Sequence, residues 1–268
     1  MQQYFAYIAA SAFVLIRPNS ARSSGSKGST MESNTPEKSA GTILIIGASR
    51  GLGHAMAAEF LKRHWTVIGT VRGTDRTLLL ELADAHPDRV EIEQLDVTRP
   101  EQISALRDRL SGRTLDILFV NAGTANADQS ETIAEVSTEE FVDVMVTNAL
   151  SPMRVVESLQ DCVAPTGMIG IMSSGQGSIA NNTKGGHEVY RGSKAALNQY
   201  MRSFAARHAG GFRALLLLAP GWIRTALGGP DAPLSLEETV PQIVDTVLAQ
   251  RDHPGLRYLD REGRTVPW

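Results

Sequence analysis

From residue 42 onward, the sequence alternates short runs of apolar residues with longer segments in which apolar residues recur at helical spacing. The apolar runs contain few polar residues, which is typical of strands buried on both faces. Such strands alternating with helices predict a parallel sheet with helices on both sides. We therefore expect residues 41–268 to form one doubly wound α/β domain. The expected strands are 42–47, 66–71, 90–95, 115–120, 168–173 and 213–219, and the expected helices include 52–64, 99–110, 138–160 and 190–208.

The first 40 residues do not share this pattern. Residues 4–16 are apolar but too few to span a bilayer, and no basic residue precedes them as in a secretory signal. Residues 17–30 are rich in Ser and basic residues. We interpret residues 1–40 as an extension that is disordered or arises from a misassigned start ahead of Met31. A targeting segment is the second possibility and a membrane anchor the third, so we expect no stable membrane anchoring.

The overall charge and the cysteine content exclude several classes of protein. A formal net charge of −3 gives no reason to expect nucleic acid or an anionic membrane as a partner. One cysteine, Cys162, cannot form an internal disulfide bond, which favours a reducing compartment such as the cytoplasm. The sequence has neither paired cysteines nor an HExxH spacing, so we expect no metal site.

The first expected strand ends in the segment GASRGLG, which leads directly into a helix. Glycines at such a position let the backbone turn tightly and approach a pyrophosphate, whose charge then lies at the N-terminus of the helix. The segment therefore predicts a dinucleotide-binding loop. Its residues with an expected role in binding are Gly47, Ser49, Arg50, Gly51, Leu52 and Gly53.

The second expected strand ends near Arg72, 19 residues after Gly53. An acidic side chain at this place contacts the 2′-hydroxyl of an adenosine ribose. An arginine instead suits a 2′-phosphate, because each charge-assisted hydrogen bond contributes about 1.5–3 kcal/mol. Arg50 in the glycine loop is a second candidate for the same phosphate, although either arginine could be an ordinary surface charge. With no acid at the strand end, the sequence favours NADP(H) over NAD(H) as cofactor.

Tyr190 and Lys194 are four positions apart at the start of an expected helix, so their side chains share one face. A phenol with a pKa near 10 is a poor acid or base at neutral pH, and lowering that pKa by about 3 units requires about 4 kcal/mol. A neighbouring ammonium and a positively charged nicotinamide would both favour the phenolate. We interpret Tyr190 as the general acid/base that protonates a substrate oxygen. Lys194 would lower the pKa of the phenol and hold the nicotinamide ribose.

The fifth expected strand ends in Ser173 and Ser174, at the sheet edge where open α/β domains bind ligands. A carbonyl that becomes an alkoxide needs a second hydrogen-bond donor, which a serine at this edge can supply. Two serines at a strand end also suit an ordinary turn.

These motifs resemble the short-chain dehydrogenase/reductase superfamily, whose first glycine loop has the same GxxxGxG spacing. The resemblance implies that Ser174 polarises the substrate carbonyl and that Ser173 is a capping or loop residue. It also implies that Asn148, in VTNAL, supports a water and proton relay behind Lys194. Further cofactor contacts implied by the resemblance, from LDVT, FVNAG and PGWIRT, are Asp96, Val97, Asn121, Ala122, Gly123, Pro220, Gly221, Ile223 and Thr225.

The resemblance extends over residues 42–268 and is closer to one branch of the superfamily. SSGQGSIANNTKGGHEVYRGSKAALN, PGWIRTALGGPDAPLSLEETV and GRTVPW are similar to the C-factor-like branch, which includes sniffer-type carbonyl reductases. The separation of 16 residues between Ser174 and Tyr190 fits the long gap of that branch. The sequence departs from the common patterns of the superfamily at four positions. These departures affect only the details of contacts and remove no catalytic group. They are Ile46, Phe119, Val120 and Ala226.

The resemblance implies an NADP(H)-dependent oxidoreductase that interconverts a small-molecule carbonyl and an alcohol, and a Rossmann-type domain. The alternative is a nucleotide-binding signalling protein with little or no turnover, because the branch includes proteins associated with cell–cell signalling. The presence of all four candidate catalytic groups argues against that alternative. A sugar-nucleotide epimerase is rejected, since only 43 residues follow Thr225. The helix after the tyrosine could serve the core or the contact face of a homo-oligomer.

The segments expected to determine the substrate are loops. We expect residues 124–130 and 176–188 to border the substrate, with His187 solvated in its loop rather than catalytic. Residues 226–250 are expected to form a lid, in which a helix begins near Ser235.

Overall fold

The structure is a computed structural model that describes residues 39–268. The extension expected at residues 1–40 therefore lies outside the described residues, apart from its last two positions. Within the described part of the chain, no helix is both long enough and apolar enough to cross a membrane.

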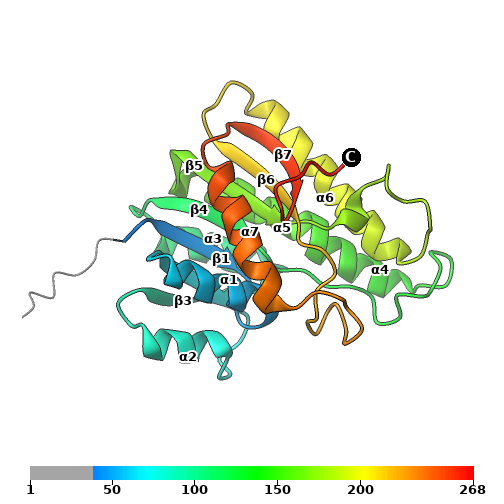
Figure 1. Cartoon of the computed structure of the whole chain (residues 1–268), viewed down its shortest axis with the longest axis horizontal. Helices are drawn as coiled ribbons and strands as arrows, with labels where there is room; N and C mark the ends of the chain where they lie inside the picture. Colours follow the sequence, from blue (N-terminus) through cyan, green and yellow to red (C-terminus); the bar gives the residue numbers. More distant parts are fainter. Residues whose placement is uncertain (1–38) are drawn as a thin grey trace, which may run out of the picture. The chain divides into compact units, whose positions relative to one another are not determined.

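Seven parallel strands form one sheet in the order β3-β2-β1-β4-β5-β6-β7 (Figure 1). This arrangement confirms the expected doubly wound α/β fold, and all six expected strands are present. The sequence pattern does not predict β7, which extends the sheet beyond β6. The strands are β1 (Thr42–Ile46), β2 (Thr66–Val71), β3 (Val90–Gln94), β4 (Leu115–Val120), β5 (Val163–Met172), β6 (Ala214–Ala219) and β7 (Gly255–Asp260).

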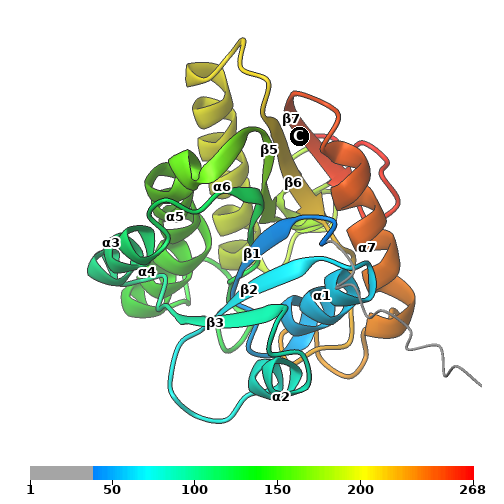
Figure 2. The same cartoon turned by 90° about the vertical axis from the view of Figure 1, so that its left-hand side faces the viewer.

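Helices cover both faces of the sheet. One face carries α1 and α7, and the other carries α3, α4, α5 and α6 (Figure 2). A π-helical turn at Val146–Leu150 interrupts the helix expected over 138–160. The helices are α1 (Gly51–Lys62), α2 (Leu78–Ala85), α3 (Pro100–Arg109), α4 (Thr138–Met145), α5 (Ser151–Leu159), α6 (Glu188–Arg207) and α7 (Leu236–Gln250).

The apolar residues of the strands divide between two buried clusters. In β1, Leu44 and Ile46 belong to the cluster that includes residues of α3, α5 and α6, whereas Ile43 and Ile45 belong to the cluster that includes residues of α1 and α7. Successive side chains of a strand point to opposite faces of a sheet. A strand that is covered on both sides therefore needs an uninterrupted apolar run, which is why these runs predict the central strands.

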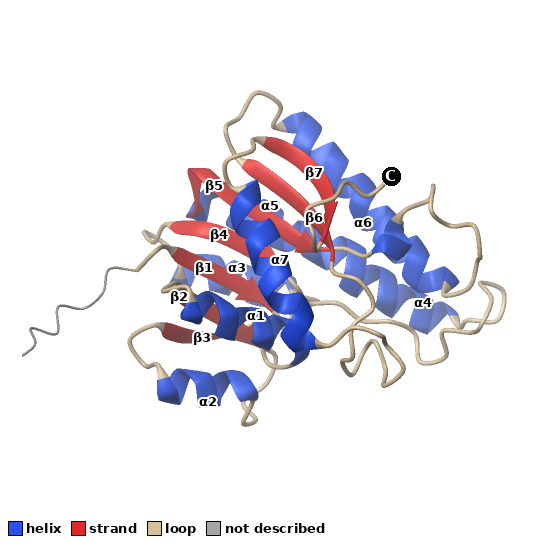
Figure 3. Cartoon of the chain, viewed as in Figure 1, coloured by secondary structure: helices blue, strands red, loops and turns tan. Residues whose placement is uncertain are grey.

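β1 lies between β2 and β4, where the chain passes from one half of the sheet to the other. In such sheets, a crevice forms at the C-terminal ends of these strands. The loops after β1 and β4 meet there, because the backbone N–H groups of Asn121 and Ala122 both donate to the carbonyl of Ile46 at 2.9 Å. Long loops gather at this end of the sheet (Figure 3).

The two elements that the sequence pattern does not predict are short and lie toward the edges of the sheet. α2 has 8 residues and fully buries only Leu79. β7 is an edge strand in which only Tyr258 and Leu259 are buried. An edge strand that is half covered does not need a continuous apolar run, so its sequence gives a weak signal.

The expectation that residues 226–250 form a lid is wrong for the second half of this segment. As expected, α7 begins after Ser235, whose side chain forms a capping box with Glu238. Beyond that cap, α7 packs against α1 and buries apolar side chains, including Ile243. This helix therefore belongs to the core, and only the loop that precedes it can cover the crevice.

Replacing Ile243 by alanine is expected to lower the free energy of unfolding by about 2–5 kcal/mol, because the side chain is fully buried. Urea unfolding, followed by circular dichroism and by tryptophan fluorescence, measures the loss. Ala249→Gln, at an exposed position of the same helix, should change the free energy by less than about 0.5 kcal/mol, because glutamine is also a good helix former. Equal stability of the two variants would contradict the placement of α7 in the core.

Candidate active site

Tyr190 and Lys194 lie in the first two turns of α6, which follows the loop after β5. The chain enters this helix through Gly185, Gly186 and His187, whose φ angles of 65°, 70° and 51° are left-handed. Glycine adopts this conformation without steric cost. Helical spacing brings Nζ of Lys194 to 5.8 Å from the centre of the Tyr190 ring. The two expected catalytic side chains therefore face the same way.

The ammonium group of Lys194 is buried at the end of β5. The residue is 3% exposed, and its Nζ donates a hydrogen bond to the carbonyl oxygen of Met172 at 2.9 Å. Burial disfavours the charged form and lowers the pKa of Lys194 to about 8. The strand therefore holds an ammonium group that loses its proton just above neutral pH.

Ser174 lies beside Tyr190. Burial raises the pKa of the Tyr190 phenol, and a hydrogen bond with the Ser174 side chain opposes part of that rise. The Ser174 hydroxyl also accepts a hydrogen bond from the backbone N–H of Gln176 at 3.1 Å, as the N-cap of a short 3-10 turn. The structure thus brings together Tyr190 and Lys194 from α6 and Ser174 from the end of β5.

Ser173 follows β5 directly and lies outside the strand, as expected of a loop residue, but it is buried. It is 2% exposed, and its hydroxyl donates to Oδ1 of Asn198 at 2.6 Å. Its backbone N–H still donates to the carbonyl of Leu218 in β6, so the residue belongs to the buried end of the sheet. Asn198 lies four residues after Lys194, and that helical spacing was the signal that could have revealed it.

Asn148 lies in the π turn and is completely buried. Its Oδ1 accepts from the backbone N–H of Thr124 at 2.8 Å, and its Nδ2 donates to the carbonyl of Thr124 at 2.7 Å and to Oγ of Ser193 at 3.0 Å. The side chain therefore fastens the loop after β4 to α6. π turns of this kind often occur at functional sites. The part of Asn148 in a proton relay stays a prediction.

The loop after β1 has the geometry that close approach of a phosphate requires. Gly47 and Gly51 have positive φ angles of 85° and 57°. A Cβ atom at Gly53 would lie 2.1 Å from the carbonyl oxygen of Gly47, so no larger residue fits there. The other residues of this loop that are expected to bind the cofactor are Ser49, Arg50 and Leu52, and all three are accessible at least in part.

The loop after β4 joins the glycine loop to the surroundings of Lys194. Nδ2 of Asn121 donates to the carbonyl of Gly47 at 2.8 Å, and a Cβ atom at Gly47 would lie 3.0 Å from Ala122. A Cβ atom at Gly123 would lie 3.4 Å from Nζ of Lys194. The expected NAG element thus runs from the glycine loop to Lys194.

The segment after β6 approaches the glycine loop. Pro220 leads into Gly221, which has a φ of 95°, and Ile223 is buried. A Cβ atom at Gly51 would lie 3.9 Å from Cγ2 of Thr225, so the two segments face each other across a narrow space.

The two candidate arginines have exposed side chains. Arg50 lies in the glycine loop and Arg72 directly follows β2, and no ion pair within residues 39–268 engages either guanidinium. Burial tends to raise the pKa of Asp96, but hydrogen bonds from Thr98 and the positive charge of Arg72 hold that pKa below its ordinary value. Val97, next to it, is buried. Arg72 therefore lies near the residues expected on the adenine side.

The two loops expected to border the substrate are joined to each other. Nδ1 of His187 lies 3.1 Å from Oε1 of Gln129, and the carboxylate of Glu188 accepts from the backbone N–H of Ile133 at 2.7 Å. His187 is half-buried and precedes α6 directly, so its side chain is partly in contact with the protein and partly exposed, and the expectation that it is not catalytic stays a prediction. These contacts connect the entrance of α6 to the loop after β4.

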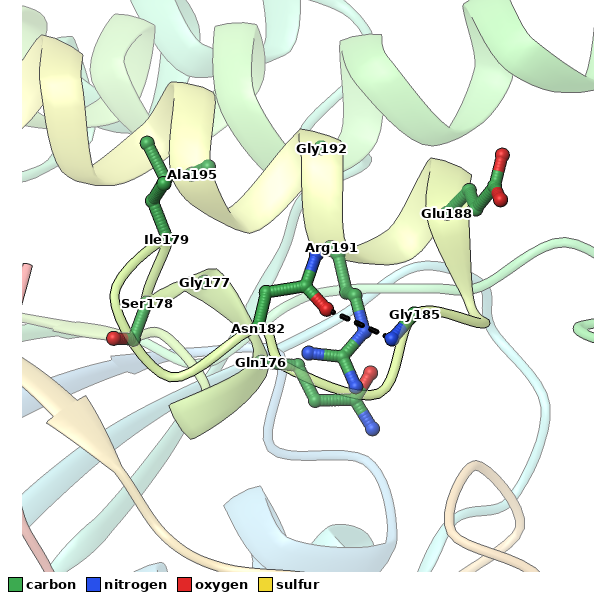
Figure 4. A pocket seen from close by; sticks show the side chains of 10 residues that line it. All are labelled: Gln176, Gly177, Ser178, Ile179, Asn182, Gly185, Glu188, Arg191, Gly192 and Ala195. Carbon is green, nitrogen blue, oxygen red and sulfur yellow. Dashed lines mark hydrogen bonds between the residues drawn. The ribbon is translucent and has the colours of Figure 1, made fainter.

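A hollow of about 310 Å³ lies between α6 and residues 176–185 (Figure 4). Within its wall, Oδ1 of Asn182 accepts from the backbone N–H of Gly185 at 3.2 Å. Tyr190 and Lys194 are not among the residues that line this hollow. The helix residues that line it are Glu188, Arg191, Gly192 and Ala195.

The residues of the crevice fit a dinucleotide that carries a 2′-phosphate. The glycine loop leaves room for a phosphate at the start of α1, and the exposed Arg50 and Arg72 suit a further phosphate. Lys194 and Ser174 occupy the other end, where a nicotinamide would meet its substrate. The described residues contain no group of three His, Cys, Asp or Glu side chains that could hold a metal ion.

Comparisons with known proteins agree with this geometry. The family model for enoyl-(acyl carrier protein) reductase matches residues 47–243. The structure of a short-chain dehydrogenase/reductase from Burkholderia multivorans with bound NADP is 67% identical, with a TM-score of 0.84, over 85% of this chain and 99% of that chain. The carbonyl reductase Sniffer of D. melanogaster is 28% identical, with a TM-score of 0.78, over 85% of this chain and 99% of its own. The C-signal protein of Myxococcus xanthus is 31% identical over 156 residues, which are 58% of this chain and 93% of that protein.

The family model covers most of the chain and includes the glycine loop, the serine pair and the Tyr190–Lys194 pair. Likeness to Sniffer and to C-signal agrees with the branch that the sequence resembles. The chain therefore belongs to the short-chain dehydrogenase/reductase family.

Proposed function

We propose that this protein is an NADP(H)-dependent oxidoreductase of the carbonyl reductase type, which interconverts a small-molecule carbonyl compound and an alcohol. The observation that carries the proposal is the convergence of Tyr190, Ser174 and the buried Lys194 at one end of a crevice whose other end has Arg50 and Arg72. The NADP-bound relative supports the choice of cofactor. The likeness to Sniffer supports a carbonyl substrate.

NADPH, when bound, supplies the hydride that reduces the carbonyl carbon. Tyr190 donates its phenolic proton to the carbonyl oxygen, and the Ser174 hydroxyl donates a hydrogen bond to the same oxygen as negative charge develops. Lys194 stabilises the phenolate that remains and holds the nicotinamide ribose. Asn148 holds the loop after β4 against α6, near Lys194, through hydrogen bonds with Thr124 and Ser193.

In the protein alone, burial raises the pKa of the Tyr190 phenol, whereas the sequence predicts that Lys194 lowers it. Because burial raises the pKa of Tyr190, the phenol keeps its proton at neutral pH, as a general acid requires. Oxidation of an alcohol needs the phenolate instead, which depends on the positive charges of Lys194 and of an oxidised nicotinamide. Any lowering of this pKa below its ordinary value therefore depends on the charge of Lys194 and on the bound cofactor.

Tyr190→Phe is expected to lower kcat by about 10²–10⁴-fold, because it removes the proton donor, while the Kd for NADPH changes little. NADPH absorbance measures turnover of a panel of aldehydes, diketones and quinones. Tyr200→Phe, at an exposed position of the same helix, is the matched control. Similar turnover in both variants would contradict the role of Tyr190. Tight NADPH binding by the unaltered protein, with no turnover of any carbonyl, would favour the signalling alternative.

Arg72→Ala is expected to weaken binding of NADPH by about tenfold or more and to leave NADH nearly unaffected, because only NADPH carries the 2′-phosphate. Fluorescence titration gives both Kd values, and Arg50→Ala should act in the same direction. Arg76→Ala removes a nearby exposed charge that pairs with Asp84 and serves as control. Equal losses of affinity for NADPH and for NADH would contradict a contact between Arg72 and the 2′-phosphate.

The pH dependence of kcat/KM for NADPH tests Lys194. The pKa of about 8 means that the ammonium is charged below pH 8 and neutral above it, whereas Tyr190, with its raised pKa, stays protonated throughout. We expect kcat/KM to be level below about pH 8 and to fall about tenfold per pH unit above it. In Lys194→Arg the rate should be lower, but this fall should disappear because a guanidinium keeps its charge. If kcat/KM still falls above about pH 8 in Lys194→Arg, the fall is due to the titration of another group.

A further inference from the structure

The buried phenol of Tyr258 has no part in the proposed reaction. It lies on β7 opposite Leu217 of β6 and is 1% exposed. Its ring belongs to the same apolar cluster as Phe204 of α6, and its centre is 5.3 Å from that of the Trp268 ring. A phenylalanine would fill this space equally well, so packing of the ring does not explain the hydroxyl.

The hydroxyl of Tyr258 reaches the end of β5. It donates a hydrogen bond to the carbonyl oxygen of Ser174, which also accepts from the backbone N–H of Gly177 at 2.9 Å. Both acceptor positions of that carbonyl are therefore occupied. Burial raises the pKa of Tyr258, so the hydroxyl keeps the proton that it donates. The peptide group that follows Ser174 is thus held from β7 as well as from within its own turn.

A buried asparagine holds the same turn from the side of α6. Asn198 accepts from Oγ of Ser173 at 2.6 Å and donates to the carbonyl of Gly177 at 3.2 Å. A Cβ atom at Gly177 would lie 2.9 Å from Nδ2 of Asn198 and 3.0 Å from Cβ of Lys194, so the turn lies directly against the helix. Ser174 is placed between these two anchors, and the direction of its hydroxyl depends on both.

The position of this hydroxyl matters because it lies near the Tyr190 phenol and opposes part of the rise in its pKa. A misplacement of about 1 Å in an active site can cost about 10²-fold in rate. We propose that Tyr258 is a positioning residue that acts through Ser174: its hydroxyl fixes the peptide after Ser174 and so directs the serine hydroxyl toward Tyr190 and the substrate oxygen. This inference rests on the proposed function, in which Ser174 polarises the carbonyl.

Tyr258→Phe removes the hydroxyl and keeps the ring. We expect kcat for carbonyl reduction to fall by about tenfold or more, with less than about threefold change in the Kd for NADPH and in KM for the carbonyl. The double variant Tyr258→Phe/Ser174→Ala should be no slower than Ser174→Ala alone, because both changes act through one hydroxyl.

Ile243→Val, in the cluster on the opposite face of the sheet, controls for a general loss of stability and should leave kcat unchanged. Two results would overturn the inference. One is an unchanged kcat in Tyr258→Phe, and the other is a further tenfold loss when Tyr258→Phe is added to Ser174→Ala.

Hydrogen exchange, measured by NMR on the full chain without substrate, separates this inference from the proposed function. Tyr258→Phe is expected to speed exchange about tenfold at the backbone N–H groups of Gln176 and Gly177, which both bond to Ser174. Ile243→Val should leave these rates unchanged. If the unaltered protein reduces no carbonyl, the proposed function fails, while faster exchange still supports the role of Tyr258 in fixing the turn. Unchanged exchange would overturn that role whatever the turnover.

Discussion

The buried ammonium of Lys194 is the interaction on which the rest of the site depends. Its hydrogen bond to the carbonyl of Met172, at 2.9 Å, ties α6 to the last residue of β5 and so sets where Tyr190 lies. Burial of a charge is costly, and here it lowers the pKa of the ammonium to about 8. A bound anion nearby would favour the charged form. Binding of a phosphate-bearing cofactor and ionisation of Lys194 therefore support each other.

The order of the strands explains how residues far apart in the sequence meet at this lysine. The loops after β1, β4 and β5 all leave the same edge of the sheet because these strands are parallel neighbours. Gly47 contacts Asn121 across the first two loops, and Gly123 lies beside Lys194. Ser174 follows β5. The crevice is thus a consequence of sheet topology, and the side chains decide only what it binds.

The central strands, the glycine loop and the Tyr190–Lys194 pair could be predicted from the sequence, because each depends on a local pattern: continuous apolar runs, glycine spacing and helical spacing. The contact between Tyr258 and Ser174 could not, since it joins residues 84 positions apart and requires the place of an edge strand with a weak apolar signal. The start of α7 could be predicted from its N-terminal cap, but its place in the core could not. A cap shows where a helix begins and gives no information on what the helix packs against.

Ser174 affects both directions of the proposed reaction, through Tyr190 and through the substrate oxygen. Its hydrogen bond opposes the rise in the pKa of Tyr190 that burial causes, so losing this bond would leave the phenol a weaker acid. A weaker acid would give its proton to the carbonyl oxygen less readily, and the substrate oxygen would lose a hydrogen bond as its negative charge develops. Both losses raise the same transition state, which the forward and reverse reactions share. In the proposed reaction, the turn held by Tyr258 and Asn198 therefore acts on carbonyl reduction and on alcohol oxidation together.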